Sequence, residues 1–162
     1  MPQKTLARPV VGLRGEIALI VYGLPAAQGS KKAFFIKKLG RAVITEDSKR
    51  TRPWRQEISG AAIDAMTQRG YKFPIVQDVP LEVRCMFYFP RPKSLKKGRV
   101  EKTTKPDNDK LERAVFDALT GTVFEDDAQI VRNVTEKHFS PQPRVEIYVK
   151  QYFAPLPLMG QQ

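Results

Sequence analysis

Residues 105–129 read KPDNDKLERAVFDALTGTVFEDDAQ, and this stretch carries most of the information about fold and chemistry. From Asp107 to Asp127 it holds seven carboxylates and two cations, a net charge of −5, whereas the whole 162-residue chain carries +11. Crowded carboxylates repel one another unless a cation neutralises them, and a divalent metal is the usual partner of hard oxygen ligands. The stretch therefore predicts an acidic site of the Mg²⁺ type in a protein that otherwise favours polyanions.

The same stretch predicts a helix with defined ends. Pro106 disfavours helical geometry at Lys105, so the chain should enter extended, and Asp107 can cap the helix that follows. Gly121 should end it. The spacing of its apolar residues predicts one buried stripe, formed by Leu111, Ala114, Val115, Ala118 and Leu119.

The aspartates of the stretch are candidate metal ligands. Side chains two residues apart point the same way in extended backbone, so Asp107 and Asp109 can converge if the helix starts at or just after them. The GTVFEDD turn would return the chain so that Asp126 or Asp127 approaches the same point. Arg113, four residues after Asp109, would lie on the same helix face and could stabilise charge on a phosphate. A guanidinium would be a poor general acid.

Ordinary structural roles also explain part of this pattern. Aspartates favour helix N-termini, and Asp109–Arg113 and Arg113–Asp117 have the spacing of helical ion pairs. Asp126 and Asp127 could be turn residues. Glu112, like Asp117, is assigned to the helix surface under either interpretation.

The positive charge is concentrated in two segments. Residues 30–55 have a net charge of +7 and residues 91–105 have +6, so the rest of the chain sums to −2. With a pI near 9.9, this clustering favours a nucleic-acid surface over solubilising charge, although two solvated loops, or a linker at 91–105, remain alternatives. The predicted DNA-contacting residues are Lys31, Lys32, Lys37, Lys38 and Arg41 on a hairpin and Arg91, Lys93, Lys96, Lys97, Arg99 and Lys105 on a mobile loop.

The flanking segments predict one α/β (α+β) domain over residues 15–153, a small mixed sheet with two main helices packed on it. Strands are expected at 16–22, 33–36, 41–45, 79–89, 130–139 and 145–153, and the first helix should start near Asp47 or Ser48 and end at Arg69-Gly70. Trp54 is read as a helix anchor and His138 as structural or solvated. Residues 1–14 should form a loose basic arm, and residues 154–162 a frayed tail.

Cys85 is the only cysteine, which excludes an intrachain disulfide and a thiolate zinc site, and its apolar neighbours place it in a buried strand. The N-terminus shows no signal peptide, and no apolar run is long enough to span a bilayer. These features predict a cytoplasmic protein without a membrane partner.

The segment KPDNDKLERAVFDALTGTVFEDDAQIV resembles the core motif of the RusA family of Holliday junction resolvases over 27 contiguous residues. That motif reads roughly Pro-Asp-x-Asp-Asn-Leu-x-Lys, then a helix ending Asp-Ala-Leu, then a turn with Asp-Asp-x-Gln. The upstream segments GLPAAQGSKKAFF and TRPWRQEI are similar to the N-terminal part of phage-borne members. The resemblance extends, more weakly, across most of residues 16–150.

The resemblance implies a RusA-like homodimer that cuts four-way DNA junctions symmetrically, with Mg²⁺, or Mn²⁺ as a substitute, as its only cofactor. Carried over, the three metal-binding aspartates are Asp107, Asp109 and Asp127. The family's Asn after the second aspartate is Lys110 here, and its catalytic Lys is Arg113. Arginine keeps the charge of lysine but not its geometry or proton chemistry, which leaves an electrostatic role for Arg113.

The sequence thus predicts a Mg²⁺-dependent endodeoxyribonuclease acting on Holliday junctions in DNA recombination and repair. One rival is a binder of branched DNA that does not cleave it, which a junction assay with Mg²⁺ would separate. Another is a nuclease for other branched or flap DNA. A third is a basic structural protein with no preference for DNA structure at matched salt.

Overall fold

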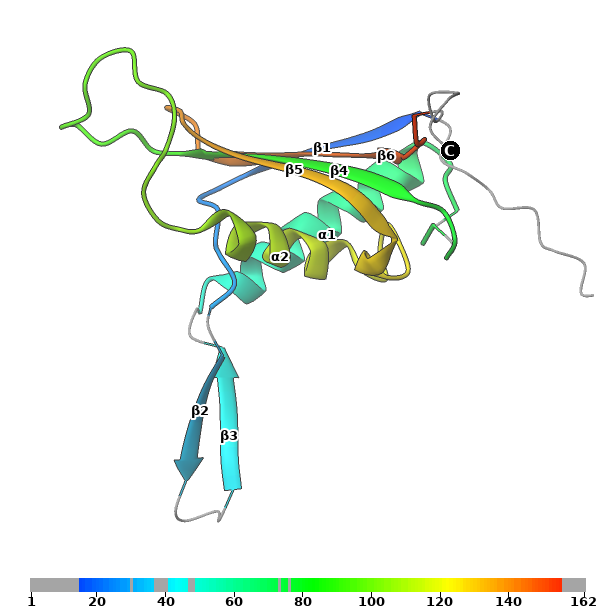
Figure 1. Ribbon diagram of the computed structural model, residues 1–162, viewed down its shortest axis with the longest axis horizontal. Helices are drawn as coiled ribbons and strands as arrows, with labels where there is room; N and C mark the ends of the chain where they lie inside the picture. The colour runs from blue at the N-terminus through cyan, green and yellow to red at the C-terminus, as the bar shows by residue number, and fades with distance from the viewer. Residues whose placement is uncertain are drawn as a thin grey trace, which may run out of the picture.

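The computed structural model describes residues 15–29, 31–36, 41–46, 49–72, 74–75 and 77–155. Six strands, two α-helices and a 3₁₀ turn follow one another along the chain (Figure 1). Their bounds are β1 Glu16–Tyr22, β2 Lys31–Ile36, β3 Arg41–Glu46, α1 Thr51–Gln68, β4 Leu81–Phe89, α2 Asn108–Leu119, η2 Asp127–Gln129, β5 Ile130–Phe139 and β6 Arg144–Gln151.

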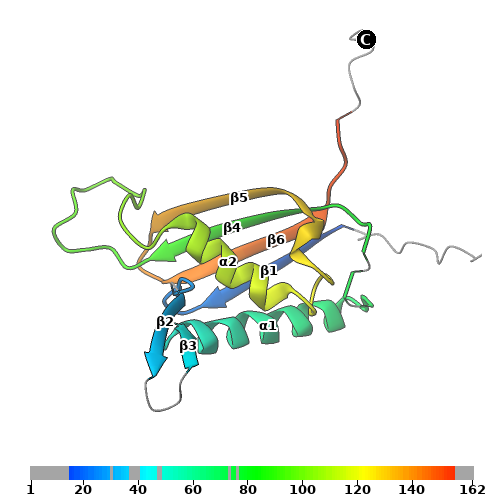
Figure 2. The same ribbon diagram turned by 60° about the horizontal axis from the view of Figure 1, so that its bottom comes forward.

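Four strands form one mixed sheet in the order β1-β6-β4-β5. The β4–β5 pair is parallel, and the other two pairs are antiparallel. Parallel neighbours need a crossover connection, and α2 supplies it between β4 and β5. Both helices lie on the same face of this sheet (Figures 1 and 2), which confirms the predicted mixed sheet with two helices packed on it.

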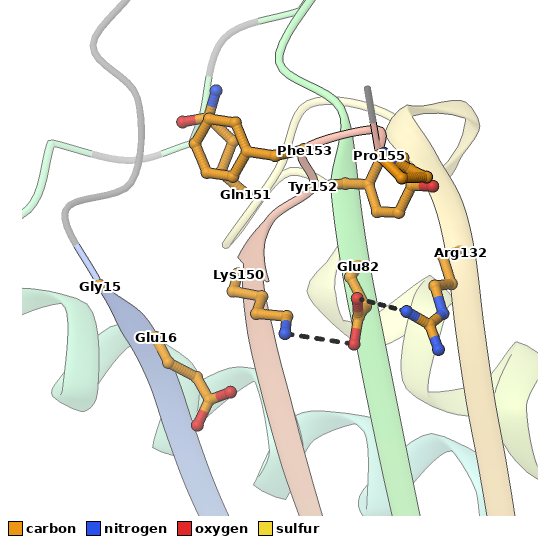
Figure 3. Close-up of a pocket in the computed structure, with 9 residues that line it drawn as sticks. All are labelled: Gly15, Glu16, Glu82, Arg132, Lys150, Gln151, Tyr152, Phe153 and Pro155. Carbon is orange, nitrogen blue, oxygen red and sulfur yellow. Dashed lines mark hydrogen bonds and ion pairs between the residues drawn. The ribbon is translucent and has the colours of Figure 1, made fainter. Parts of the chain in front are cut away.

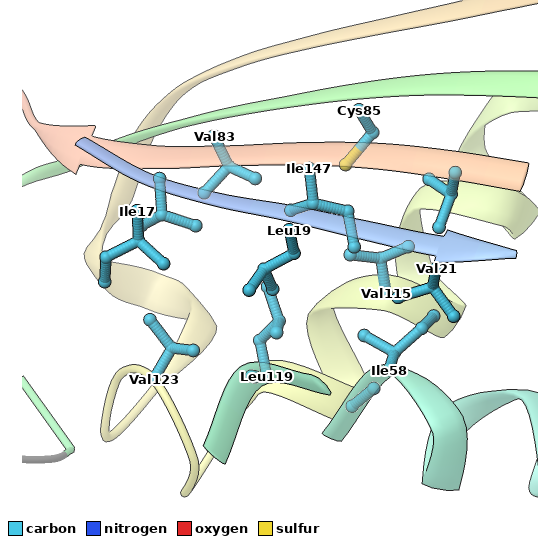
Figure 4. Close-up of a cluster of buried hydrophobic side chains, with 14 of the residues drawn as sticks. Ile17, Leu19, Val21, Ile58, Val83, Cys85, Val115, Leu119, Val123 and Ile147 are labelled. Atoms are coloured by element: carbon cyan, nitrogen blue, oxygen red, sulfur yellow. The ribbon is translucent and has the colours of Figure 1, made fainter. Parts of the chain in front are cut away.

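The core lies between the sheet and the two helices (Figure 4). Alternate residues of β4 and β6 point into it: β4 contributes Leu81, Val83, Cys85, Phe87 and Phe89, and β6 contributes Val145, Ile147 and Val149. All five residues of the predicted α2 stripe are buried, and Leu111 and Val115 have no exposed surface. Full burial of such a side chain contributes about 1.5–3 kcal/mol. This packing fixes which face of α2 is turned towards solvent.

The first helix is anchored at its N-terminal end. Trp54 is 5 % exposed, and a Cβ on Gly23 (φ +132°) would lie 3.2 Å from its ring, so glycine allows this close approach. The Thr51 hydroxyl donates to the Ala27 carbonyl at 2.7 Å. The structural interpretation of Trp54 is confirmed. The helix begins at Thr51, whereas the predicted start at residues 47–48 lies outside the described residues.

Strands β2 and β3 pair only with each other and form a hairpin that projects from the body (Figure 1). Both strands extend slightly beyond the predicted bounds. The predicted turn at residues 39–40 and the arm at residues 1–14 lie outside the described residues.

The basic loop before α2 is tied to the end of β5 by backbone hydrogen bonds. The Lys102 amide donates to the Lys137 carbonyl at 3.0 Å, and the Phe139 amide donates to Val100 at 2.6 Å. Within the loop, the Arg91 guanidinium donates to the carbonyls of Lys96 and Arg99. These contacts position the loop directly beside the N-terminal end of α2.

The sheet face opposite the helices carries paired charges. Glu82, only 6 % exposed, accepts from Arg132 and Lys150, each at 3.4 Å, in a cavity at one end of this face (Figure 3). Arg144 stacks over the Tyr88 ring at 3.8 Å and pairs with Glu146 at 2.7 Å. Because Arg132, Lys150 and Arg144 are paired with carboxylates within the sheet, these three cations offer little free positive charge to a polyanion.

His138 belongs to the same open face. Its imidazole lies 2.9 Å from the Glu136 carboxylate and contacts the Tyr88 ring. These contacts fit the predicted structural role. No helix in the described ranges is both long and apolar enough to cross a lipid bilayer.

Cys85 is 1 % exposed, and burial raises the pKa of its thiol, with the nearby Glu112 charge acting in the same direction. A raised pKa means less thiolate in the folded protein than in the unfolded chain at the same pH, and the thiolate is the reactive form. We expect Cys85 to resist a disulfide reagent such as Ellman's reagent at pH 8 in native buffer and to react within minutes in guanidinium. Native reaction at the rate of free cysteine would contradict this burial.

Candidate active site

The chain enters α2 through a cis Lys105–Pro106 peptide bond and an extended Asp107 (φ −74°, ψ 146°). Asp107 occupies the N-cap position, as predicted, but its side chain makes no capping hydrogen bond. The Lys110 ammonium lies 3.8 Å from its carboxylate, which is half exposed. The Asp107 carboxylate is therefore not consumed by capping and remains accessible to a ligand.

Asp109 and Arg113 lie one turn apart on the solvent-facing side of α2, opposite the buried stripe. In the described part of the chain neither side chain has a hydrogen-bond or ion-pair partner. The alternative that Asp109 pairs with Arg113 and Arg113 with Asp117 is therefore wrong. Asp117 pairs instead with Arg55 of α1 at 3.0 Å.

Glu112 has a role that the sequence interpretation missed. Its carboxylate accepts from the Thr135 hydroxyl at 2.7 Å and from the Asn133 amide, both on β5. Asn108 also donates to the Thr135 carbonyl at 3.2 Å. The sequence contained a signal for this contact. Alternate residues of β5 that face α2, namely Asn133, Thr135 and Lys137, are polar.

Lys137 fixes the backbone just ahead of the aspartates. Its ammonium donates to the carbonyls of Thr104 at 3.0 Å and Pro106 at 2.7 Å. Together with the Glu112 contacts, these bonds attach the start of α2 to the edge strand of the sheet. The position of Asp107 and Asp109 is thus set by rigid elements on both sides.

The Asp126-Asp127 pair divides into two roles. Asp126 caps η2, accepting from the Ala128 amide at 2.8 Å, while Gln129 accepts in return from the Asp126 amide at 3.2 Å. Gln129 is buried and donates to the Val79 carbonyl. The turn interpretation therefore holds for Asp126. Asp127 is exposed and is not used in this capping box.

The aspartates do not all meet within one chain. Asp107 and Asp109 lie at the N-terminal end of α2, whereas Asp127 lies beyond its C-terminal end (Figure 1). A helix of 12 residues spans about 18 Å at about 1.5 Å per residue. Within the described ranges no three carboxylate, imidazole or thiolate side chains are grouped so that they could hold a metal ion. The assignment of the three aspartates as metal ligands stays a prediction.

Comparison with known proteins agrees with the motif. The family model described as "Endodeoxyribonuclease RusA" matches residues 25–150. The chain belongs to the RusA family. It is also 30 % identical over 148 residues to a protein of Bacillus subtilis (strain 168) named "Uncharacterized protein YqaN", covering 85 % of this chain and 98 % of that protein.

The donor chemistry at the start of α2 in this RusA-family protein suits Mg²⁺. Two accessible carboxylates offer hard oxygen atoms, and Mg²⁺ is commonly held by one or two carboxylates with water and substrate phosphate in its other positions. Asp107 and Asp109 would hold the ion. Asp127 lies beyond the opposite end of α2. It could not bind the same ion from within the same copy without a rearrangement.

The predicted DNA-contacting residues fall into two groups in this RusA-family protein. On the loop all six are exposed, and Lys105 leads directly into α2. On the hairpin, Lys31 and Lys32 lie on β2 and Arg41 lies on β3, whereas Lys37 and Lys38 lie outside the described residues. The hairpin and the loop both start close to the N-terminal end of α2 (Figures 1 and 2).

Proposed function

We propose that this protein is a Mg²⁺-dependent endodeoxyribonuclease that resolves Holliday junctions by paired, symmetric cuts during DNA recombination and repair, inside a bacterial or phage-infected cell. Membership of the RusA family supports an endodeoxyribonuclease. The observation that carries the proposal is the start of α2, where Asp107 and Asp109 are exposed and Asp107 is not used for capping. Exposed carboxylates at a family motif that make no hydrogen bond to the described residues are the expected ligands of a catalytic ion.

Each residue then has a defined task. Asp107 and Asp109 would hold Mg²⁺, which would supply polarisation of the phosphoryl oxygen and a lowered pKa for the attacking water. Arg113 faces the same solvent as Asp109 and stabilises negative charge on the phosphate. It does so electrostatically, because a guanidinium does not release its proton near neutral pH. Glu112 and Lys137 act as positioning residues that hold the start of α2.

We further propose a homodimer whose active site takes residues from both copies. Within one chain, the length of α2 separates Asp127 from Asp107 and Asp109. A second copy is therefore the simplest source of the third carboxylate. A four-way junction has approximate twofold symmetry and must be cut on two strands. A dimer with a twofold axis and two such sites matches that requirement.

The basic hairpin and loop hold the DNA arms in this proposal. Because the two basic segments contain more than the whole net charge of the chain, many phosphate contacts would form at once. Each contact releases counterions, so affinity should fall steeply as salt rises. The open sheet face, where Arg132, Arg144 and Lys150 are paired with carboxylates, is not expected to contact DNA.

The test is cleavage of a synthetic four-way junction with and without Mg²⁺, at one salt concentration, with fork and linear duplex as competitors. We expect paired nicks in the junction only when Mg²⁺ is present, and loss of cleavage in Asp107→Asn. Tight junction binding without cleavage by the wild type would instead support a binding protein. Faster cleavage of the fork than of the junction would support a nuclease for other branched DNA.

A further inference from the structure

A cavity of about 690 Å³ lies beside the N-terminal end of α2. It is open to solvent on one side and is lined by residues 24–29, Arg50 just before α1, the ends of β4 and β5, and the basic loop. This volume falls within the range of roughly 300–1,000 Å³ that is usual for small-ligand sites. Its wall includes Lys105, Pro106 and Lys110, so it adjoins the two aspartates of the candidate active site.

The cavity is distinguished by its charge. Four cations line it and no carboxylate does, whereas each of three other cavities in the described ranges has two carboxylates in its wall. The four cations are Arg50, Lys102, Lys105 and Lys110. Lys110 lies 3.8 Å from the Asp107 carboxylate, but neither Lys102 nor Lys105 pairs with any carboxylate that the structure describes. The wall therefore carries positive charge that an anion would neutralise.

Lys102 is partly buried in the wall. Its ammonium lies over the rings of Phe89 at 5.1 Å and Phe139 at 5.4 Å, and it donates to the Thr104 hydroxyl at 2.6 Å. Burial and the neighbouring positive charge of Lys137 lower the pKa of Lys102. Two lysines that repel each other without a carboxylate between them favour binding of an anionic group in this position.

The remainder of the wall is largely apolar. It includes Pro25, Pro90, Pro92 and Phe139, and on one side Gln28, whose amide oxygen is buried without a hydrogen-bond partner among the described residues. Aromatic and apolar surfaces of this kind receive bases that have left the stack. The ligand that fits both halves has a flat apolar part and an anionic part.

We propose that this cavity binds one unstacked nucleotide of branched DNA, next to the phosphate that is cut. Its phosphate pairs with Lys102 and Lys105, and its base lies against the proline and phenylalanine wall. The inference rests on the proposed function for the source of the nucleotide. Bases at a branch point have incomplete stacking and pairing, so they are the least costly to extrude. The cavity would thereby distinguish a junction from continuous duplex.

The first experiment uses neither junction nor metal. The full-length protein is titrated with deoxycytidine 5′-monophosphate, with deoxycytidine and with inorganic phosphate, and binding is followed by amide chemical shifts. We expect the monophosphate to bind more tightly than either fragment, with shifts confined to residues around the cavity. Equal affinity for phosphate and monophosphate would overturn the proposal, because the site would then hold only a backbone phosphate. Absence of binding by all three ligands would also overturn it.

The second experiment compares three variants. Lys102→Ala and Lys105→Ala should each weaken monophosphate binding about tenfold, the loss of one charge-assisted contact. Lys105 is exposed, so its variant tests the site even if Lys102→Ala disturbs folding. Lys72→Ala removes the same charge from an exposed position outside the cavity and should leave binding unchanged. An equal loss in all three variants would show non-specific charge attraction and contradict the proposal.

A junction with 2-aminopurine at the branch point then connects the cavity to DNA. Without Mg²⁺, binding of the wild type should raise the 2-aminopurine fluorescence severalfold as the base unstacks, and Lys102→Ala should abolish most of this rise at saturating protein. An unchanged rise in Lys102→Ala would overturn the proposal. If the protein binds the monophosphate but does not cleave the junction, the nucleotide site stands and the proposed function fails. If it cleaves the junction but does not bind the monophosphate, the proposed function stands and the nucleotide site fails.

Discussion

Replacing Asp109 with asparagine should slow Mg²⁺-dependent junction cleavage about 100-fold or more, equivalent to at least about 2.7 kcal/mol of transition-state stabilisation. The change removes one anionic oxygen from the proposed ligand pair. Asp109 has no hydrogen-bond or ion-pair partner in the described part of the chain, so folding should be unaffected. Cleavage is measured on a labelled four-way junction. Junction binding, measured by gel shift without metal, should persist.

The matched control is Asp117→Asn, the same substitution two turns further along α2. Asp117 pairs with Arg55 at 3.0 Å, and loss of this partly exposed pair should cost about 0.2–1 kcal/mol of stability. Its cleavage rate should equal that of the wild type, because Asp117 contacts α1 rather than the proposed site. Full cleavage by Asp109→Asn, or an equal loss in Asp117→Asn, would show that Asp109 is not a metal ligand.

Mixing two inactive variants should restore cleavage if the active site is shared between copies. A heterodimer of Asp109→Asn and Asp127→Asn has one site that lacks both aspartates and one site that lacks neither. We expect each homodimer to be inactive, and the heterodimer to nick one strand of the junction at about the rate of one wild-type site. The heterodimer is isolated with two affinity tags, and nicks are counted on both strands.

The control heterodimer combines Asp109→Asn with Asp107→Asn. Both residues belong to the same end of α2, so each of its sites lacks one aspartate and it should remain inactive. If the Asp109→Asn and Asp127→Asn heterodimer is as inactive as its parents, each copy uses its own Asp127. The site would then form within one chain, after a rearrangement that brings Asp127 to the N-terminal end of α2.

Much of the fold could be predicted because it depends on periodicity along short segments. The five apolar positions of α2 recur at helical spacing, and all five are buried. The alternation on β4 and β6 likewise placed Cys85 and Ile147 inside. The predicted ends of the strands were less accurate than their existence. Strand β4 starts at Leu81, two residues later than predicted, and β6 ends at Gln151, two residues earlier than predicted.

Contacts between distant segments could not be predicted from spacing. The sequence indicated helical ion pairs for Asp117, but its partner is Arg55, 62 residues away on a neighbouring helix. Glu112 was assigned to the surface, yet two side chains of β5 bind it. Asp117 reaches α1 and Glu112 reaches β5 only because the tertiary fold places these elements beside α2.

The candidate site shows the same division. Local chemistry indicated Asp107, Asp109 and Arg113 as candidates, since a proline-led helix start and helical spacing dictate where such side chains point. The pattern could not show that Asp127 would lie beyond the opposite end of α2. Nor could it show that four cations and several prolines would line a cavity beside the aspartates. Those facts depend on how the β4–α2–β5 crossover packs on the sheet. Burial of the α2 stripe orients the helix as a rigid body, and every long-range distance follows from that orientation.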